Sequence, residues 1–249
     1  MNAQLNYYLQ IADNALILSH RLAEYSSNGP FLEEDLATTN VALDLLGIAE
    51  SVFNQAALIE GKGRTGDDFA YRRAEHEYVN SILVEQTNTD FAHIMVRQFF
   101  TDAFHFYFFT ELTKSKDSFL SALAIKSLKE TTYHLRRSSE WMIRLGSGTQ
   151  EANERTQGAI NLLWKYTDDF FTSSDCDNEM LSAGYGVNLD SVQLQWIQKV
   201  KEICYMAHLT LPDNGYSITG GKYGRHSEQL GYILAEMQYL TSKYPDAVW

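Results

Sequence analysis

Proline constrains this chain most, because it is nearly absent. The 249 residues contain only three prolines, Pro30, Pro212 and Pro245, and each stands where an apolar helical pattern has already ended. Proline inside a helix removes a hydrogen bond and clashes with the preceding turn, so the long intervals between these positions are free to form unbroken helices. No segment shows the strict alternation of apolar and polar residues that is typical of a strand. The sequence therefore predicts an all-α protein.

Helical periodicity and capping residues divide the chain into helices. Ser, Thr, Asp or Asn stands at most of the predicted starts, where such side chains accept hydrogen bonds from free backbone N–H groups. The second helix is expected to carry its core residues at Leu36, Leu43, Leu46, Val52 and Phe53. The expected helices cover approximately residues 5–25, 32–60, 68–80, 88–114, 117–146, 149–171, 190–204 and 227–240, with irregular stretches at 61–67, 172–189 and 209–226.

Charge and composition exclude several classes of protein. Lys and Arg total 20 against 32 Asp and Glu, so the formal net charge of −12 argues against binding to nucleic acid. The N-terminus lacks a signal-peptide pattern, and polar residues are expected to interrupt every apolar stretch before it could span a membrane. Two cysteines, Cys176 and Cys204, have no metal-type spacing and suit a reducing compartment. We expect a cytoplasmic protein that forms one domain over residues 1–249.

The histidines are the first candidates for metal ligands. Helical di-iron sites use Glu-x-x-His, because this spacing aims a carboxylate and an imidazole inward together, and the sequence contains no such motif. Only His93 and His105 have a carboxylate three residues earlier. Asp90, before His93, stands at a helix start and is interpreted as a cap. Asp102, before His105, lies inside an apolar helix and needs a partner, for which a nearby His or Arg is favoured over a metal.

A second polar pair lies on the next predicted helix. Glu130 and His134 are four residues apart and therefore neighbours on one helix face. If the two helices are adjacent, this pair meets Asp102 and His105, either as a metal site or as a metal-free polar network. On the 32–60 helix, Asp44 is the one plausible interior carboxylate, because Glu50 is expected to face outward.

Aromatic residues crowd the predicted helix at 88–114. They are too dense to face a single core, so they either pack several internal layers or cover a partner protein. The residues concerned are Phe99, Phe100, Phe104, Phe106, Phe108 and Phe109. Elsewhere, Gly220-Gly221-Lys222 lacks the spacing and the preceding strand of a phosphate-binding loop.

Several segments together resemble the accessory, non-iron subunit of bacterial phenylacetyl-CoA epoxidases. The segments are Asn40–Gly47, Leu83–Gln86, Lys129–Arg136, Thr219–Lys222 and Leu234–Leu240. The resemblance runs from the first helix to the last residue. It implies a ferritin-like helical bundle with additional helices, which pairs with a homologous catalytic subunit in phenylacetate catabolism. In that subunit a di-iron centre inserts one oxygen atom of O2 into the ring of phenylacetyl-CoA, with electrons from a separate NADPH-dependent reductase that carries flavin and iron–sulfur groups.

The resemblance also implies what this chain lacks and what it contributes. Where the catalytic relatives have Glu, His and Glu, this sequence has Leu45, Ile48 and Thr131, and of the ligands compared only His134 remains. The chain is therefore expected to hold no metal and no cofactor, with Asp44, Asp102, His105, Glu130 and His134 as a vestigial site or buried polar network. Part of the shared acyl-CoA site is expected from this chain. The implied contacts are Glu77, Tyr78, Val79, Asn80, Asn178, Glu179 and Met180.

Three hypotheses for function remain at this point. The first is a catalytically silent scaffold that supports the di-iron subunit and the docking of the reductase. The second is a di-metal oxidase that uses the five residues of the polar network itself. The third is a helical binding module that acts without the catalytic subunit.

Overall fold

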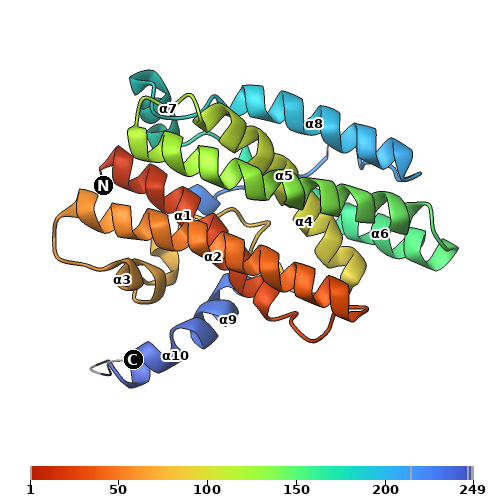
Figure 1. Cartoon of the computed structure of the whole chain (residues 1–249), viewed down its shortest axis with the longest axis horizontal. Helices are drawn as coiled ribbons and strands as arrows, with labels where there is room; N and C mark the ends of the chain where they lie inside the picture. The colour runs from red at the N-terminus through yellow and green to blue at the C-terminus, as the bar shows by residue number, and fades with distance from the viewer. Residues whose placement is uncertain (1, 214, 246, 248–249) are drawn as a thin grey trace. The chain divides into compact units, whose positions relative to one another are not determined.

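The computed structural model describes residues 2–213, 215–245 and 247, and these residues form helices and connecting segments without any strand (Figure 1). The all-α prediction is confirmed. Contacts divide the chain into two compact units, which we describe separately. The first unit comprises Met1–Thr87 and Gly220–Trp249, and the second comprises Asn88–Thr219. A single domain over 1–249 stays a prediction.

The first unit is built on an antiparallel pair of helices, α1 (Ala3–Ala23) and α2 (Leu32–Glu60), which lie side by side in Figure 1. The Ser19 hydroxyl of α1 donates to the carbonyl oxygen of Ala42 in α2 at 2.7 Å. Gly61, with φ 65°, ends α2 in the left-handed conformation that favours glycine. The remaining elements are α3 (Gly66–Tyr71), η1 (Glu75–Glu77), η3 (Gly221–Tyr223), α9 (Glu228–Met237) and α10 (Tyr239–Lys243).

The second unit is organised around α4 (Phe91–Leu112), which packs against three other helices of that unit. They are α5 (Ser118–Gly146), α6 (Gln150–Leu163) and α8 (Leu189–Met206). Two further elements, η2 (Trp164–Phe170) and α7 (Asp175–Ala183), lie between α6 and α8 in the chain.

The aromatic residues of α4 are part of this unit's core. Phe104 stacks on Phe170 with a centroid separation of 4.4 Å, and the Trp196 indole N–H donates to the carbonyl oxygen of Phe100 at 2.8 Å. Five of the six phenylalanines are buried and Phe106 is half-buried. Internal layers therefore account for most of the aromatic density.

The predicted helix starts are largely correct. Asp90, Asp117, Thr149 and Ser227 each accept a hydrogen bond from a backbone N–H of the following turn. Asn188 caps α8, so this helix begins at residue 189 rather than at the expected residue 190.

Three ranges differ from the prediction. The expected helix at 68–80 is only α3 and the short turn η1, and the expected helix at 149–171 changes to 3₁₀ geometry after residue 163. The supposedly irregular stretch 172–189 contains α7, which Ser174 begins with a capping box and Gly184 ends.

The expected buried stripe of α2 is partly wrong. Leu36 and Leu43 are 54% and 60% exposed, whereas Val52 and Phe53 are buried as predicted. The buried face instead carries Val41, Ala42, Leu45, Ile48, Ala49, Val52, Phe53 and Ala56. Leucines and other apolar residues occupy both faces of this helix, so periodicity alone does not select the face that is buried.

The α2 helix also differs from the expectation that polar residues interrupt every apolar stretch before it could span a membrane. Within the described part of the chain, α2 alone is long and apolar enough, by length and composition, to cross a membrane. One such helix is weak evidence, because a core helix of a globular protein passes the same test, and 44% of its apolar window is buried here.

Candidate functional site

The predicted polar site begins on α4, where Asp102 and His105 are both buried. The Gln98 side-chain amide donates to Asp102 Oδ1 at 2.6 Å. Burial raises the pKa of Asp102, and the charge of the neighbouring His134 opposes this shift. Burial also lowers the pKa of His105 to about 3, because a charged imidazole loses its hydration there. His105 is therefore neutral at physiological pH.

The second half of this site lies on α5. His134 is buried, and its charge acts on the pKa of both Asp102 and His105, so these three groups lie near one another. Glu130 is half-buried one turn before His134. The structure thus brings Asp102, His105 and His134 together within the second unit. Asp44 is half-buried on α2 and belongs to the first unit.

The residues at the implied ligand positions do not fit a di-iron centre. Leu45 and Ile48 are buried apolar side chains of α2, and neither offers a lone pair to a metal. Thr131 is buried, and its hydroxyl donates to the carbonyl oxygen of Ser127 at 3.0 Å. No group of three or more His, Cys, Asp or Glu side chains in the described residues is placed to hold a metal ion.

The other His–carboxylate pair has the structural role expected from the sequence. The Asp90 side chain accepts a hydrogen bond from the His93 backbone N–H at 2.8 Å and caps α4. Arg155 lies 3.5 Å from the same carboxylate. Burial lowers the pKa of His93 to about 4. The interpretation of Asp90 as a cap is confirmed.

The implied acyl-CoA contacts fall into two groups, one in each unit. Glu77 is exposed, whereas Tyr78, Val79 and Asn80 are buried in the first unit. In the second unit, residues 178 and 179 are exposed on α7 and Met180 is buried. Their role in binding stays a prediction.

Tyr78 and Val79 contact a buried ion pair that sequence reasoning missed. Arg73 and Asp13 form a two-point salt bridge with both side chains buried, in which Arg73 Nη1 lies 3.0 Å from Asp13 Oδ2. The Val79 backbone N–H donates to the same oxygen at 2.9 Å. The guanidinium carbon lies 4.1 Å from the centre of the Tyr78 ring. Asp13 thus connects α1 to the segment that follows α3.

A second missed pair connects the two chain segments of the first unit. His226 Nδ1 lies 3.0 Å from Glu85 Oε2, and the Ser227 backbone N–H donates to Glu85 Oε1 at 2.6 Å. The Asn80 amide donates to Oε2 at 3.1 Å. Burial lowers the pKa of His226, but hydrogen bonding and the charge of Glu85 outweigh it, so the pKa is raised. No local sequence signal predicts this contact, because its partners are 141 residues apart.

One pocket of the first unit contains two of the implied contacts. It has a volume of about 350 Å³, and both Glu77 and Val79 line it. Basic side chains from three segments, Arg64, His76 and Lys222, also line it. We call this the basic pocket.

The protein is therefore an all-α helical protein, consistent with a ferritin-like bundle. Its interior holds carboxylate and imidazole groups, but within the described residues they do not gather into a set that could hold a metal ion. The family described as phenylacetic acid catabolic protein matches residues 1–249. One of the subunits of the 1,2-phenylacetyl-CoA epoxidase of Escherichia coli (strain K12) is 41% identical over 249 residues, which cover 100% of both chains. The chain therefore belongs to the phenylacetic acid catabolic protein family, and the resemblance is confirmed.

Proposed function

We propose that this chain is the non-catalytic structural subunit of a cytoplasmic, multicomponent di-iron monooxygenase that epoxidises the ring of phenylacetyl-CoA. The observation that carries the proposal is the burial of Leu45, Ile48 and Thr131 at the positions implied to hold metal ligands. Full-length similarity to a subunit of a phenylacetyl-CoA epoxidase supports the assignment to such a complex. The iron centre, which supplies the oxygen chemistry, then belongs to a homologous catalytic subunit.

The chemistry of the interior supports a structural role. Iron needs carboxylate and imidazole donors that also neutralise its charge, and leucine and isoleucine offer neither. Burying each of these side chains instead contributes about 1.5–3 kcal/mol to folding. The chain thereby forms a stable helical body that holds the catalytic subunit in shape and supports docking of the NADPH-dependent reductase.

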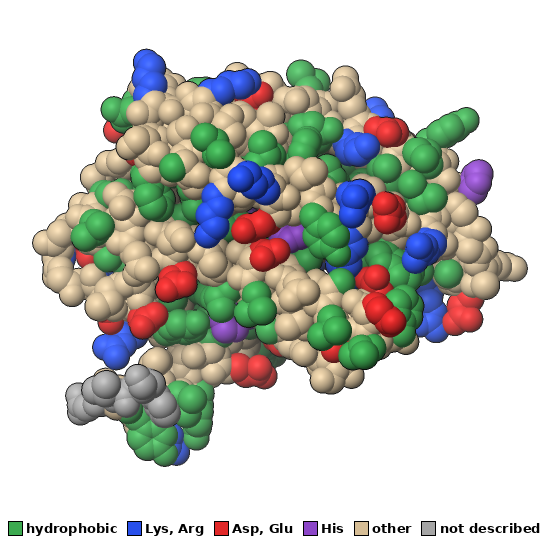
Figure 2. All heavy atoms as spheres, viewed as in Figure 1, with side chains coloured by type: hydrophobic (Ala, Val, Ile, Leu, Met, Phe, Trp, Pro, Cys, Tyr) green, Lys and Arg blue, Asp and Glu red, His purple; other side chains and the backbone are tan. Residues whose placement is uncertain are grey.

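The surface of α2 supports a protein partner. Leu32, Leu36, Leu43 and Leu58 are all exposed on this one helix. On the face drawn in Figure 2, hydrophobic side chains are interspersed with charged ones. Apolar side chains gathered on one element mark surfaces that associate with other proteins more often than isolated ones do.

The basic pocket supports a contribution to acyl-CoA binding. Coenzyme A carries several phosphate charges, and His76 and Lys222 place basic groups around one concave surface, beside Arg64, which is paired with Glu60. Glu77 and Val79 line the same pocket, as the implied contacts require. The chain as a whole is acidic, so a local basic pocket gives the phosphates a preferred place to bind.

Iron analysis tests the proposal directly. The chain should contain no stoichiometric iron when purified alone after expression in iron-replete medium, and iron should appear when it is co-purified with the catalytic subunit. His105→Ala and His134→Ala should leave the iron content of the complex unchanged. Stoichiometric iron in the isolated chain that both substitutions abolish would overturn the assignment.

A di-metal oxidase is the second candidate, and one observation favours it. Asp102, His105 and His134 lie together and are buried, as the donors of a metal site would be. This alternative predicts metal-dependent oxygen consumption by the isolated chain. A stand-alone binding module predicts instead that the chain does not co-elute with the catalytic subunit in size-exclusion chromatography.

A further inference from the structure

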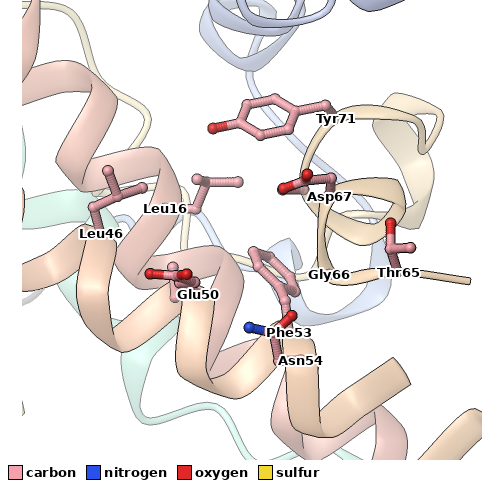
Figure 3. A pocket seen from close by; sticks show the side chains of 11 residues that line it. Leu16, Leu46, Glu50, Phe53, Asn54, Thr65, Gly66, Asp67 and Tyr71 are labelled. Atoms are coloured by element: carbon pink, nitrogen blue, oxygen red, sulfur yellow. The ribbon is translucent and has the colours of Figure 1, made fainter. Parts of the chain in front are cut away.

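A second pocket of the first unit shares no lining residue with the basic pocket. Its volume is about 340 Å³, and it opens between α1, α2 and α3 (Figure 3). Leu16 and Phe53, both buried, contribute apolar surface to it, and the half-buried Leu46 lines the α2 side. This volume is within the range of small-molecule sites, and the apolar lining suits an organic ligand.

Two carboxylates stand at this pocket on different elements. Figure 3 shows Glu50 on α2 and Asp67 on α3, with the Tyr71 ring on the α3 side. Both carboxylates are exposed, and neither forms a hydrogen bond or an ion pair with another described residue. The pocket therefore carries two negative charges without an internal counter-charge.

The two arginines that flank α3 in the sequence are already paired. Arg64 binds Glu60, with Nη2 and Oε1 2.5 Å apart, and Arg72 lies 3.4 Å from Asp68. Burial raises the pKa of Tyr71, and the charge of Asp67 raises it further, so Tyr71 keeps its proton. Its hydroxyl can donate or accept a hydrogen bond within the pocket.

A glycine gives the pocket its shape. A Cβ atom at Gly66 would lie 2.5 Å from the Asn54 side-chain oxygen, so glycine lets the start of α3 approach α2 without displacing that side chain. The approach places the two carboxylates on the same concave surface.

We propose that this pocket binds a small organic cation, an amine with a compact apolar or aromatic body. The ammonium group lies between Glu50 and Asp67, and the apolar body rests against Phe53 and Leu16. The two negative charges repel phosphate, so this ligand is distinct from the acyl-CoA of the proposed function. The inference does not depend on that function.

Three probes of nearly the same shape separate charge from hydrophobicity. 2-Phenylethylamine is a cation, 2-phenylethanol is neutral and phenylacetate is an anion at neutral pH. Titration of the full chain, followed by NMR shifts or by calorimetry, should show saturable binding in the order amine, alcohol, acid. Binding of the amine should weaken as salt is added, because exposed charges are screened. Equal binding of all three probes, or no saturable binding of the amine up to millimolar concentration, would overturn the proposal.

Isosteric variants locate the binding site. Glu50→Gln and Asp67→Asn should each weaken amine binding by about 1.5-fold to fivefold, the range that exposed charge pairs give. Glu33→Gln is the matched control, since it removes the same charge from an exposed position of α2 outside the pocket. Leu46→Trp fills the apolar wall without changing the charge and should also weaken binding. Circular dichroism confirms folding of each variant, and unchanged affinity in both carboxylate variants would refute the site.

Discussion

His226 and Glu85 form a buried ion pair that uses both nitrogens of the imidazole ring. Nδ1 lies 3.0 Å from Glu85 Oε2, and Nε2 lies 2.8 Å from the carbonyl oxygen of Tyr78. A carbonyl oxygen only accepts, and so does an ionised carboxylate, so both ring nitrogens must donate. The geometry therefore assigns a charged imidazolium to His226, in agreement with its raised pKa.

The first prediction is that stability decreases as pH rises above the unfolded-state pKa of histidine. Because the pKa of His226 is raised in the folded protein, its contribution is fully present below the unfolded value of about 6.5. The contribution is lost as pH rises through the folded pKa. Urea unfolding at a series of pH values measures this loss. His226→Gln should reduce the pH dependence in this window, and parallel profiles for the two proteins would contradict the assignment.

The second prediction concerns the ion pair between Arg73 and Asp13. Asp13→Ala leaves the guanidinium buried without its carboxylate, so the free energy of unfolding should fall by about 3–5 kcal/mol. The double variant Asp13→Ala/Arg73→Met removes both charges and should lose less than the sum of the single losses. Urea unfolding of the wild type, Asp13→Ala, Arg73→Met and the double variant measures the coupling free energy between the two side chains. Additive losses would show that the pair does not couple.

The third prediction concerns the polar cluster of the second unit. Asp102→Ala removes the acceptor of the Gln98 amide in a buried site, which should cost about 1–3 kcal/mol. Asp102→Asn keeps an acceptor of the same shape and should cost less. Thermal melts of both variants compare the two effects, with iron content measured in parallel. An unchanged melting temperature for Asp102→Ala would rule out a stabilising buried network around this carboxylate.

Local patterns in the sequence were sufficient to predict most of the fold. The side chains of Asp90, Asp117 and Thr149 cap helices, and that role depends only on the few residues that follow each of them. Leu36 and Leu43 were expected in the core but are exposed, so the local pattern did not predict which face of α2 is buried. Both faces of α2 are apolar, so the buried face is decided by tertiary packing.

The candidate site was predicted less completely, for a related reason. Asp102 and His105 share one helix, and their burial follows from the apolar residues around them. The partners of Glu85 and Asp13 lie 141 and 60 residues away, at distances that no motif encodes. Tyr78 was singled out only by the family resemblance, while the structure places its ring beside the guanidinium of Arg73.

The last prediction concerns η3, which carries Lys222 at the basic pocket. Gly224, at the end of η3, has a φ of 70°, and a Cβ atom there would overlap the carbonyl oxygen of His76. Both atoms of the clash belong to the backbone or are fixed to it, so neither can rotate away. Gly224→Ala should therefore displace η3, reduce stability and weaken coenzyme A binding to the complex with the catalytic subunit.

Gly158→Ala is the matched control for this substitution. Gly158 lies inside α6, and a Cβ atom added there meets nothing within 4 Å. Alanine is the better helix former, so this variant should gain about 0.5–1 kcal/mol and bind coenzyme A as the wild type does. Urea unfolding and calorimetric titration with coenzyme A measure both effects. Equal behaviour of the two variants would mean that the contact between Gly224 and His76 does not position the η3 turn.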